Sequence, residues 1–302
     1  MNIVVLGAGA IGSLFGGLLS QKNTVVLVGR TPHITAIRKS GLTITGKTLM
    51  TVHVSAEDSI DNVHIQPDVL IITVKSYDTE EAIQAATSLI TKKTIVISLQ
   101  NGLDNIEKIK KTVDIKNILG GVTTHGAILV KPGLIRHTGF GQTILGELTG
   151  ENTNRVADLV SLFNEAGIET IITTNFLREL WIKTIINSSI NPLTALFFCK
   201  NGYLLENPLL ENVMNQICKE STAVAISEKI AVTYEEMAEK TKEVVRMTAE
   251  NYSSMLQSVQ RETKTEIDSI NGAILQMGKK QGVDVSLNEI LVYLMQSLHK
   301  TG

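Results

Sequence analysis

The chain has 302 residues, of which 43% are hydrophobic and 19% charged, a composition typical of a packed globular protein. Its length suits two domains better than a single core. The formal net charge is −2 and no segment is dominated by Lys or Arg, which excludes an obvious electrostatic basis for binding nucleic acid or an anionic membrane. Cys199 and Cys218 form no Cys-x-x-Cys pair and fit free thiols. We therefore expect a cytoplasmic protein, and a secreted one with a single bridge stays open.

Residues 1–173 alternate short β-rich runs with helical patterns. Such alternation indicates a mainly parallel sheet covered by helices on both faces. The expected strands are Ile3 to Leu6, Thr24 to Val28, Val69 to Val74, Thr94 to Leu99 and Glu169 to Thr173. The expected helices are Ala10 to Ser20, Thr79 to Ile90 and Asn154 to Ala166, the last ending at Gly167.

Short segments separated by glycines depart from that alternation. Leu42 to Thr45 and Leu49 to Val54 flank Gly46-Lys47, which predicts an inserted hairpin. A second group of short runs suggests antiparallel strands that extend the main sheet. Its members are Gly126 to Val130, Leu134 to His137 and Thr143 to Leu145.

Strand signals end near Asn175, and long helical patterns follow to the end of the chain. We therefore predict two domains, residues 1–173 and 174–302, the second all-helical. Leu180 to Cys199 is about as long and apolar as a membrane span. It holds Lys183, Asn187, Asn191 and Pro192, which would be unfavourable in lipid. A buried helix is the better interpretation, and no membrane partner is expected.

A glycine-rich turn joins the first expected strand to the first expected helix. Gly7-Ala8-Gly9-Ala10-Ile11-Gly12 has the spacing G-x-G-x-x-G, typical of the dinucleotide-binding Rossmann turn. Gly7 permits a tight turn, Gly9 lets a pyrophosphate approach the backbone, and Gly12 allows close helix-to-strand packing. Free N–H groups at the helix N-terminus favour the phosphate charge. We therefore predict a Rossmann-like sheet that binds a dinucleotide.

The second strand distinguishes the two nicotinamide cofactors. An acidic residue at its end would hold the ribose hydroxyls of NAD, but here the strand runs into Gly29, Arg30 and Thr31. Arg30 can pair a 2′-phosphate through charge-assisted hydrogen bonds, so NADP(H) is favoured. A solvated surface arginine is the alternative. Lys75 and Asn101 follow two later strands at the same edge, and could reach the cofactor phosphate and the nicotinamide or substrate.

Polar residues form a stripe on the apolar segment 180–199. Lys183, Asn187 and Asn191 stand at i, i+4 and i+8, so they share one helix face. On a buried helix they meet polar protein groups or line a wet cleft, because an unpaired buried ammonium is expensive. Burial also lowers a lysine pKa toward values suited to proton transfer. The alternative is a lysine that extends to the surface, with amides capping nearby loops.

Two further residues are ambiguous on their own. Thr263 with Glu266, or Thr265 with Asp268, fits a capping box at a helix start, which would give Glu266 a structural role. Ser254 is a lone serine in the stretch Asn251-Tyr252-Ser253-Ser254-Met255. The spacing alone assigns no chemistry to either residue.

Taken together, these motifs resemble the ketopantoate reductase (2-dehydropantoate 2-reductase) family over essentially the whole chain. The matching motifs are Gly7-x-Gly9-x-x-Gly12, Lys75, Gln100-Asn101-Gly102, Gly121-Val122-Thr123-Thr124-His125, Glu179-Leu180-Trp181-x-Lys183, Asn187-x-x-x-Asn191-Pro192-Leu193-Thr194-Ala195, Ser253-Ser254-Met255 and Thr265-Glu266-Ile267-Asp268-x-Ile270-Asn271-Gly272. The resemblance implies reduction of ketopantoate to pantoate with NADPH, a step in pantothenate and coenzyme A synthesis.

The resemblance also implies a role for each matching residue. Lys183 would be the general acid that protonates the C2 carbonyl oxygen, and Glu266 the carboxylate that works beside it. The implied substrate-binding residues are Asn101, Asn187, Asn191 and Ser254. The implied cofactor-binding residues are Gly7, Ala8, Gly9, Ala10, Ile11, Gly12, Arg30, Lys75 and Asn101. Neither the motifs nor the resemblance calls for a metal.

The expected partner is a small 2-oxo acid, bound with the cofactor between the carboxyl edge of the sheet and the helical domain. Reduction of another branched 2-oxo acid is the nearest alternative function. A non-catalytic NADP-sensing regulator is an alternative of a different class, disfavoured because sensing requires neither Lys183 nor Glu266. A homodimer is left open by the sequence.

Overall fold

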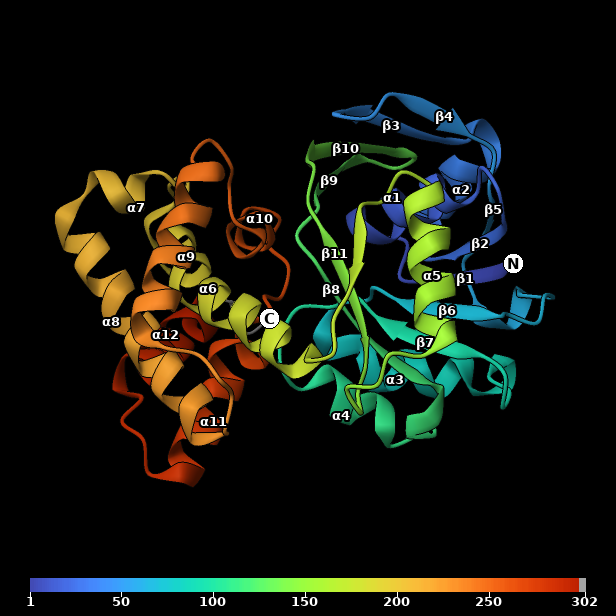
Figure 1. Ribbon diagram of the computed structural model, residues 1–302. Coiled ribbons are helices and arrows are strands. Elements are labelled where there is room, and N and C mark those ends of the chain that lie inside the picture. Colours follow the sequence, from blue (N-terminus) through green and yellow to red (C-terminus); the bar gives the residue numbers. More distant parts are fainter. Residues whose placement is uncertain (299–302) are drawn as a thin grey trace. The chain divides into compact units, whose positions relative to one another are not determined.

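The computed structural model describes residues 1–298, which fall into two compact units. The N-terminal unit comprises Met1–Gln100 and Asn105–Phe176. The helical unit comprises Asn101–Asp104 and the chain from Leu177 onward. The α/β fold class with a helical C-terminal part, expected from the sequence, is confirmed (Figure 1).

The main sheet of the N-terminal unit has the strand order β12-β11-β8-β7-β6-β1-β2-β5. Its strands are β1 Asn2–Leu6, β2 Thr24–Val28, β5 Ser55–Glu57, β6 Val69–Ile72, β7 Ile95–Ser98, β8 Ile118–Thr123, β11 Thr143–Glu147 and β12 Thr170–Ile172. Neighbours pair in parallel except β8 with β11. The chain passes from β1 to β2 on one side and later to β6 on the other. The carboxyl end of β1 is therefore the switch point where such sheets bind ligands.

A second sheet corrects the sequence prediction for the inserted strands. It has the order β4-β3-β10-β9, built from β3 Leu42–Gly46, β4 Met50–Val52, β9 Gly126–Lys131 and β10 Leu134–Gly139. The expected hairpin forms, because β3 pairs antiparallel with β4. The segments near Gly126 and Leu134 do not extend the main sheet, however, and of that group only β11 does so.

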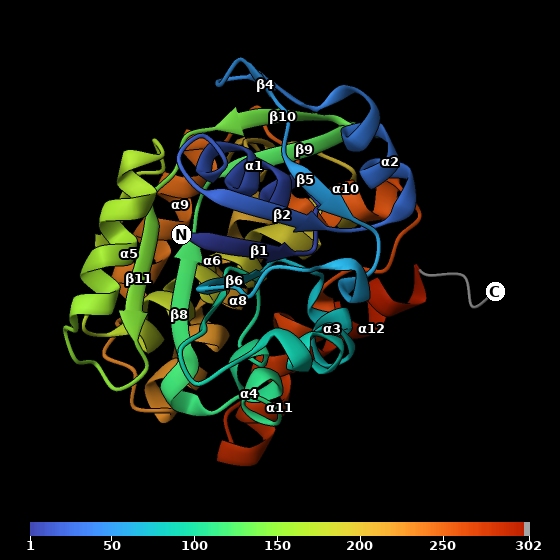
Figure 2. The ribbon, with the colours of Figure 1, turned by 90° about the vertical axis from the view of Figure 1, so that its right-hand side faces the viewer.

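Helix α1, Ala10–Leu19, explains why those strands form a separate sheet. It contacts β1 and β2 of the main sheet on one side and β3, β9 and β10 on the other (Figure 2). Two glycines allow this double contact. A Cβ atom at Gly16 would lie 2.3 Å from Leu27 of the main sheet, and one at Gly17 would lie 2.9 Å from Ile44 of the second. A helix that is apolar on nearly all sides is stable only when it is buried, and here the two sheets bury it.

The other helices of the N-terminal unit are α2 Thr31–Ser40, α3 Thr79–Ala85, α4 Asn105–Lys110 and α5 Asn154–Glu165. The helix predicted from Thr79 to Ile90 is α-helical only to Ala85 and continues as a 3-10 turn over Ala86–Leu89. The hydroxyl of Thr87 donates to the carbonyls of Ile83 and Gln84 there. This competition between side chain and backbone tightens the last turn.

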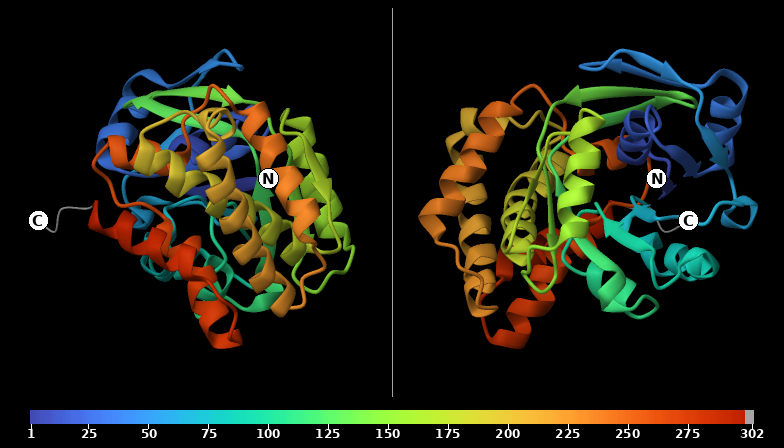
Figure 3. Two further views of the ribbon diagram at one scale, coloured as in Figure 1. Left: turned by 90° about the vertical axis from the view of Figure 1, so that its left-hand side faces the viewer. Right: turned by 45° about the vertical axis from the view of Figure 1, so that its right-hand side comes forward.

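The helical unit contains α6 Phe176–Phe197, α7 Tyr203–Glu206, α8 Pro208–Ser227, α9 Tyr234–Met247, α10 Ser254–Gln260, α11 Asn271–Gln281 and α12 Ser286–Ser297. Helix α8 packs against α9, α11 and α12 (Figure 3). Ile190 and Leu193 of α6 share a buried core with Met214 of α8 and Leu291 of α12. Helix α6 is thus a buried helix, and none of the helices within residues 1–298 has the length and hydropathy needed to span a bilayer. Both cysteines are free thiols.

Candidate active site

The glycine turn between β1 and α1 is held too tightly for side chains at two of its positions. Gly7 has a φ of +108°, and a Cβ atom there would lie 2.4 Å from the backbone nitrogen of Val74. A Cβ atom at Gly12 would lie 2.3 Å from the carbonyl oxygen of Gly7 and 2.4 Å from Oγ1 of Thr73. The Thr73 hydroxyl donates to the same Gly7 carbonyl at 2.8 Å. These two glycines are therefore required by the packing of the loop after β6 against the turn.

Gly9 is different, because its missing side chain leaves open space. The nearest atom to a Cβ placed there is the carbonyl oxygen of Gly7, at 3.9 Å. Gly9 is the N-cap of α1, makes no side-chain cap, and the first turn carries no acidic residue. Uncapped N–H groups and a positive helix end attract an anion. The turn therefore fits the pyrophosphate of a dinucleotide.

Arg30 lies at the position where the sequence predicts a contact to the 2′-phosphate. It follows the end of β2 as the N-cap residue of α2 and is exposed to solvent. No residue of the N-terminal unit forms an ion pair with its guanidinium in the structure. Its charge is therefore available to a ligand at the carboxyl edge of the sheet.

Two carboxylates near the carboxyl end of β2 were not predicted from the sequence. Glu57 ends β5, which pairs with β2, so Glu57 lies beside Val28 although it is distant in sequence. Arg38 of α2 forms ion pairs with Glu57 and, at 3.5 Å, with Asp58. The carboxylate that an NAD site uses is thus absent from β2, and those that approach from β5 are paired. The position of these two carboxylates depends on the order of strands in the sheet, which cannot be read from the sequence.

The loops after β6 and β7 are tied to each other by Gln100. Its amide donates to the carbonyl of Val74 at 2.8 Å and to the hydroxyl of Thr79 at 2.7 Å, and it accepts from Ser98 at 3.0 Å. Lys75, the predicted phosphate ligand, stands at the N-cap position of the 3-10 turn Ser76–Asp78 and is partly buried. Gln100 therefore fixes the backbone just before Lys75.

Helix α6 presents the predicted polar stripe within the helical unit. Lys183 and Asn187 are partly buried, and Asn191 is 6% exposed. Within the helical unit no described group accepts a hydrogen bond from the Lys183 ammonium. The three side chains project from successive turns of a helix that is otherwise largely buried. They form a row of donors and acceptors that a small polar ligand can bind.

Glu266 approaches Lys183 although the two are far apart in sequence. Its side chain is 6% exposed, and its charge acts directly on the Lys183 ammonium. Oε2 of Glu266 also accepts a hydrogen bond from Nδ2 of Asn101 at 3.5 Å. The short segment Asn101–Asp104 belongs to the helical unit, and Ser269 donates to Asp104 within it. The structure thus brings Lys183, Glu266 and Asn101 together.

The capping box that would pair Thr263 with Glu266 does not form. Glu266 precedes the 3-10 turn Ile267–Ser269 but makes no side-chain cap, and the hydroxyl of Thr263 donates to the carbonyl of Ser258. The next α-helix begins only at Asn271. A buried carboxylate that accepts from an amide and whose charge acts on a lysine, rather than capping helix N–H groups, is typical of a functional site.

Burial shifts the pKa of Lys183. Removal from water lowers the pKa of Lys183 to about 8, whereas the negative charge of Glu266 raises it and so limits the fall. A lysine with such a pKa is partly protonated near neutrality and can donate its proton. The pair therefore has the electrostatics of a general acid beside a carboxylate.

Ser254, the last predicted substrate ligand, is exposed at the first turn of α10. The neighbouring Ser253 is the N-cap of that helix and accepts from the backbone N–H of Leu256. The hydroxyl of Thr194 in α6 donates to Ser253 at 2.7 Å. Ser253 therefore anchors α10 to α6 close to Asn191, and leaves Ser254 free to contact a ligand.

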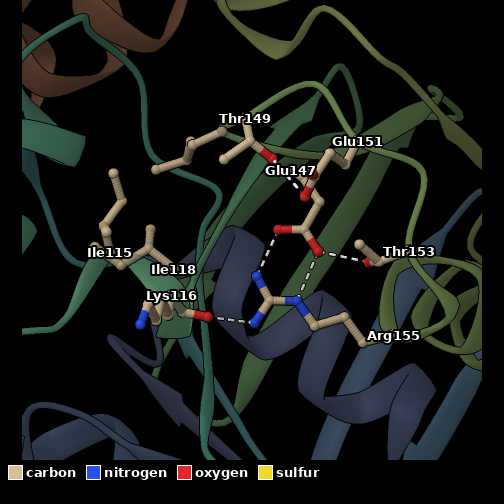
Figure 4. Close-up of a pocket in the computed structure, with 9 residues that line it drawn as sticks. Ile115, Lys116, Ile118, Glu147, Thr149, Glu151, Thr153 and Arg155 are labelled. Atoms are coloured by element: carbon tan, nitrogen blue, oxygen red, sulfur yellow. Dashed lines mark hydrogen bonds and ion pairs between the residues drawn. The ribbon is translucent and has the colours of Figure 1, made fainter.

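One surface pocket has no part in this arrangement. It has a volume of about 220 Å³ and lies where β8 begins and β11 ends, at the edge of the sheet opposite the glycine turn (Figure 4). Glu147 there accepts from Arg155 and Thr153, and Arg155 also donates to the carbonyl of Lys116. Burial opposes its charge, but these hydrogen bonds keep the pKa of Glu147 below its ordinary value. Glu147 and Arg155 therefore satisfy each other in this pocket. Within residues 1–298 no group of His, Cys, Asp and Glu side chains is arranged to bind a metal.

Comparison with known proteins assigns the chain to a family. The description "Ketopantoate reductase PanE/ApbA" matches residues 3–150, and its C-terminal counterpart matches residues 175–299. The chain belongs to the ketopantoate reductase family. Among curated relatives, the 2-dehydropantoate 2-reductase of Pyrococcus horikoshii is 39% identical over 100% of this chain and 99% of its own. That of Halobacterium salinarum is 35% identical over the full length of both.

Solved structures agree with this assignment. A PanE/ApbA family ketopantoate reductase from Ralstonia eutropha superposes with a TM-score of 0.91 at 29% identity, covering 99% of this chain and 98% of its own. D-mandelate dehydrogenase in complex with NADH and anilino(oxo)acetate superposes with a TM-score of 0.93 at 28% identity, with the same coverage. The same fold is therefore found in a protein named ketopantoate reductase and in one named D-mandelate dehydrogenase.

Proposed function

We propose that this protein is an NADPH-dependent 2-dehydropantoate 2-reductase that converts ketopantoate to pantoate and so serves pantothenate and coenzyme A synthesis. The charge of Glu266, which acts on Lys183 beside the polar stripe of α6, carries this proposal. The relatives that bear this enzyme name match over the whole of the given chain, which supports the proposal.

The N-terminal unit supplies the cofactor site in this proposal. Gly7 to Gly12 receive the pyrophosphate at the N-terminus of α1, and Arg30 pairs with the 2′-phosphate. Lys75 adds a second positive charge at the same edge. The open space at Gly9 supports this assignment, as does Arg30, whose exposed guanidinium forms no ion pair within the N-terminal unit. When bound, the dinucleotide supplies the hydride.

The helical unit supplies the proton and holds the substrate. Asn101, Asn187, Asn191 and Ser254 bind the carboxylate, carbonyl and hydroxyl groups of the 2-oxo acid. Negative charge grows on the C2 oxygen as hydride arrives, and the Lys183 ammonium stabilises that oxygen and transfers a proton to it. Glu266 favours the charged form of Lys183 and accepts a hydrogen bond from the new hydroxyl. The products are a 2-hydroxy acid and the oxidised cofactor.

A second candidate is reduction of another 2-oxo acid. The similarity to D-mandelate dehydrogenase favours it, because that protein is described with NADH and an aromatic oxo acid analogue. Reaction at the C2 carbonyl would use the same lysine and carboxylate, so only the side-chain pocket and the cofactor would differ.

A panel of substrates and cofactors tests the proposal. Purified protein is assayed for oxidation of NADPH and NADH with ketopantoate, with 2-oxoisovalerate and with phenylglyoxylate. The proposal expects the highest kcat/KM for ketopantoate with NADPH. A preference for phenylglyoxylate with NADH would select the second candidate instead. Tight NADPH binding without turnover of any 2-oxo acid would contradict both and point to a sensing protein.

A further inference from the structure

A proline interrupts the hydrogen bonding of α6 at the C-terminal end of its polar stripe. Pro192 lies inside the continuous helix Phe176–Phe197 and has no N–H to donate. In a regular α-helix that N–H would bond to the carbonyl of Ser188, four residues earlier. Ser188 follows Asn187 directly, and its side chain is completely buried. A buried carbonyl without a donor is unfavourable, so another group must meet it.

Asn271 is the group that meets it. Its Nδ2 donates to the carbonyl oxygen of Ser188 at 3.0 Å and to Oδ1 of Asn288 at 3.0 Å. The side chain is 0% exposed, so water does not compete. Both amide hydrogens are used on acceptors, which fixes the orientation of the amide group. Asn271 thus replaces the donor that Pro192 removes.

The partner of Asn271 is held rigidly in turn. Nδ2 of Asn288 donates to Oε2 of Glu220 at 2.9 Å, and the same carboxylate caps the first N–H groups of α12. The hydroxyls of Ser188 and Ser221 hydrogen-bond at 3.0 Å. The carbonyl on α6 is therefore tied to α8, α11 and α12 by a buried polar network. Such a network specifies one arrangement of the helices it joins.

The place of Asn271 in the chain connects this network to the site. It is the first residue of α11 and follows the 3-10 turn Ile267–Ser269, which begins right after Glu266. Ser188 lies on the helix that carries Lys183, Asn187 and Asn191. The hydrogen bond therefore joins the two elements that bring the lysine and the carboxylate together.

We propose that Asn271 is a positioning residue that sets the distance between Lys183 and Glu266 by replacing, at the Ser188 carbonyl, the helical hydrogen bond that Pro192 cannot make. The proposal rests on the function proposed above, because it assigns the reaction to that pair. Asn271 itself does not need to touch the substrate.

The first test compares two Asn→Ala variants. Asn271→Ala should lower kcat with ketopantoate about 10- to 100-fold, because displacements near 1 Å at a catalytic group have effects of that size. The KM for NADPH should change by less than about twofold, because the residues assigned to its pyrophosphate and 2′-phosphate lie in the N-terminal unit. Asn201→Ala is the matched control: Asn201 is also a buried amide of the helical unit, and donates to Thr248 at 2.9 Å. That variant should keep kcat within about twofold.

The second test is rescue by a restored backbone donor. Pro192→Ala returns an N–H that can bond to the Ser188 carbonyl within α6. In that background, adding Asn271→Ala should lower kcat by less than about threefold, well short of the loss in the wild-type background. The wild-type protein, Asn271→Ala, Pro192→Ala and the double variant are also compared in urea unfolding. The fall in the unfolding midpoint caused by Asn271→Ala should be smaller in the Pro192→Ala background than in the wild-type background.

The outcomes separate this proposal from the proposed function. A folded Asn271→Ala protein with kcat unchanged would overturn the positioning role. Equal losses in both backgrounds, or an equal loss in Asn201→Ala, would do the same, because the effect would not act through the Ser188 carbonyl. Wild-type protein without turnover of ketopantoate would instead contradict the proposed function, and the urea cycle would still decide whether Asn271 replaces the missing helical donor.

Discussion

The charge of Glu266 should control the pH at which the enzyme loses activity. A general acid must be protonated, so kcat/KM should fall as pH rises through the pKa of Lys183 in the free enzyme. Burial brings that pKa from 10.5 to about 8, which corresponds to about 3 kcal/mol against the ammonium form. The wild-type profile should therefore decline tenfold per pH unit above about 8.

Glu266→Gln removes the one negative charge that opposes this fall while nearly preserving the size of the side chain. An opposite charge at short range raises a lysine pKa by about 1 or more, so its loss should move the decline to lower pH by about one unit. At pH 8 the protonated fraction of Lys183 would then fall from about one half to about one tenth, roughly a fivefold loss, and the ratio approaches tenfold only well above pH 8.

The assay measures NADPH oxidation at limiting ketopantoate across the range in which the protein stays folded. Glu262→Gln is the matched control, because Glu262 is exposed and lies in the same segment. It should leave the profile unchanged. A decline in kcat/KM of Glu266→Gln at the same pH as in the wild type, or at a higher pH, would refute this reasoning. The alkaline decline could not then be assigned to a lysine whose charged form Glu266 stabilises.

Three further predictions concern the N-terminal unit. Arg30→Ala should raise the KM for NADPH about 10- to 100-fold, because a charge-assisted contact to the 2′-phosphate is lost, and should change the KM for NADH little. Equal effects on the two KM values would contradict the role of Arg30. Gly12→Ala should lower the free energy of unfolding by about 1–3 kcal/mol, measured in urea, because the new Cβ would overlap the Gly7 carbonyl. His125 is held neutral: burial, and then the charge of His137, lowers the pKa of His125 to about 4. Stability present above pH 6.5 should thus fall between pH 6.5 and 4, by up to about 3 kcal/mol. His125→Gln should flatten that dependence, whereas the exposed His64→Gln should leave it unchanged.

Much of the N-terminal unit could be predicted because its signals are local. The alternation of apolar runs and the glycine turn identify β1, α1 and β2 nearly to the residue. The assignment of β9 and β10 to a second sheet could not be predicted. Strand patterns report that a segment is extended, but they do not say which partner it pairs with. The deciding feature is α1, whose glycines at 16 and 17 let two sheets approach it from opposite sides.

The candidate site was predictable in part for a similar reason. The spacing of Lys183, Asn187 and Asn191 places them on one face of any helix, whatever the tertiary fold. Glu266 gave no such signal, because its neighbours resemble a capping box, and only the resemblance to a family connected it with the lysine. The contact that pairs them is long-range and depends on the packing of α6 near the start of α11.

Pro192 shows that a sequence can identify a backbone carbonyl that needs a donor without identifying the residue that supplies it. A proline in a buried helix implies that the carbonyl four residues earlier needs another donor, and the sequence alone identifies that carbonyl as Ser188. It does not identify Asn271, because any polar side chain brought near by the fold could serve. An uninterrupted helix could hold Lys183 and Asn187 in line by itself but would have no obligatory link to the segment after Glu266. The proline creates that link, because the hydrogen bond it removes is replaced here by Asn271, from outside the helix.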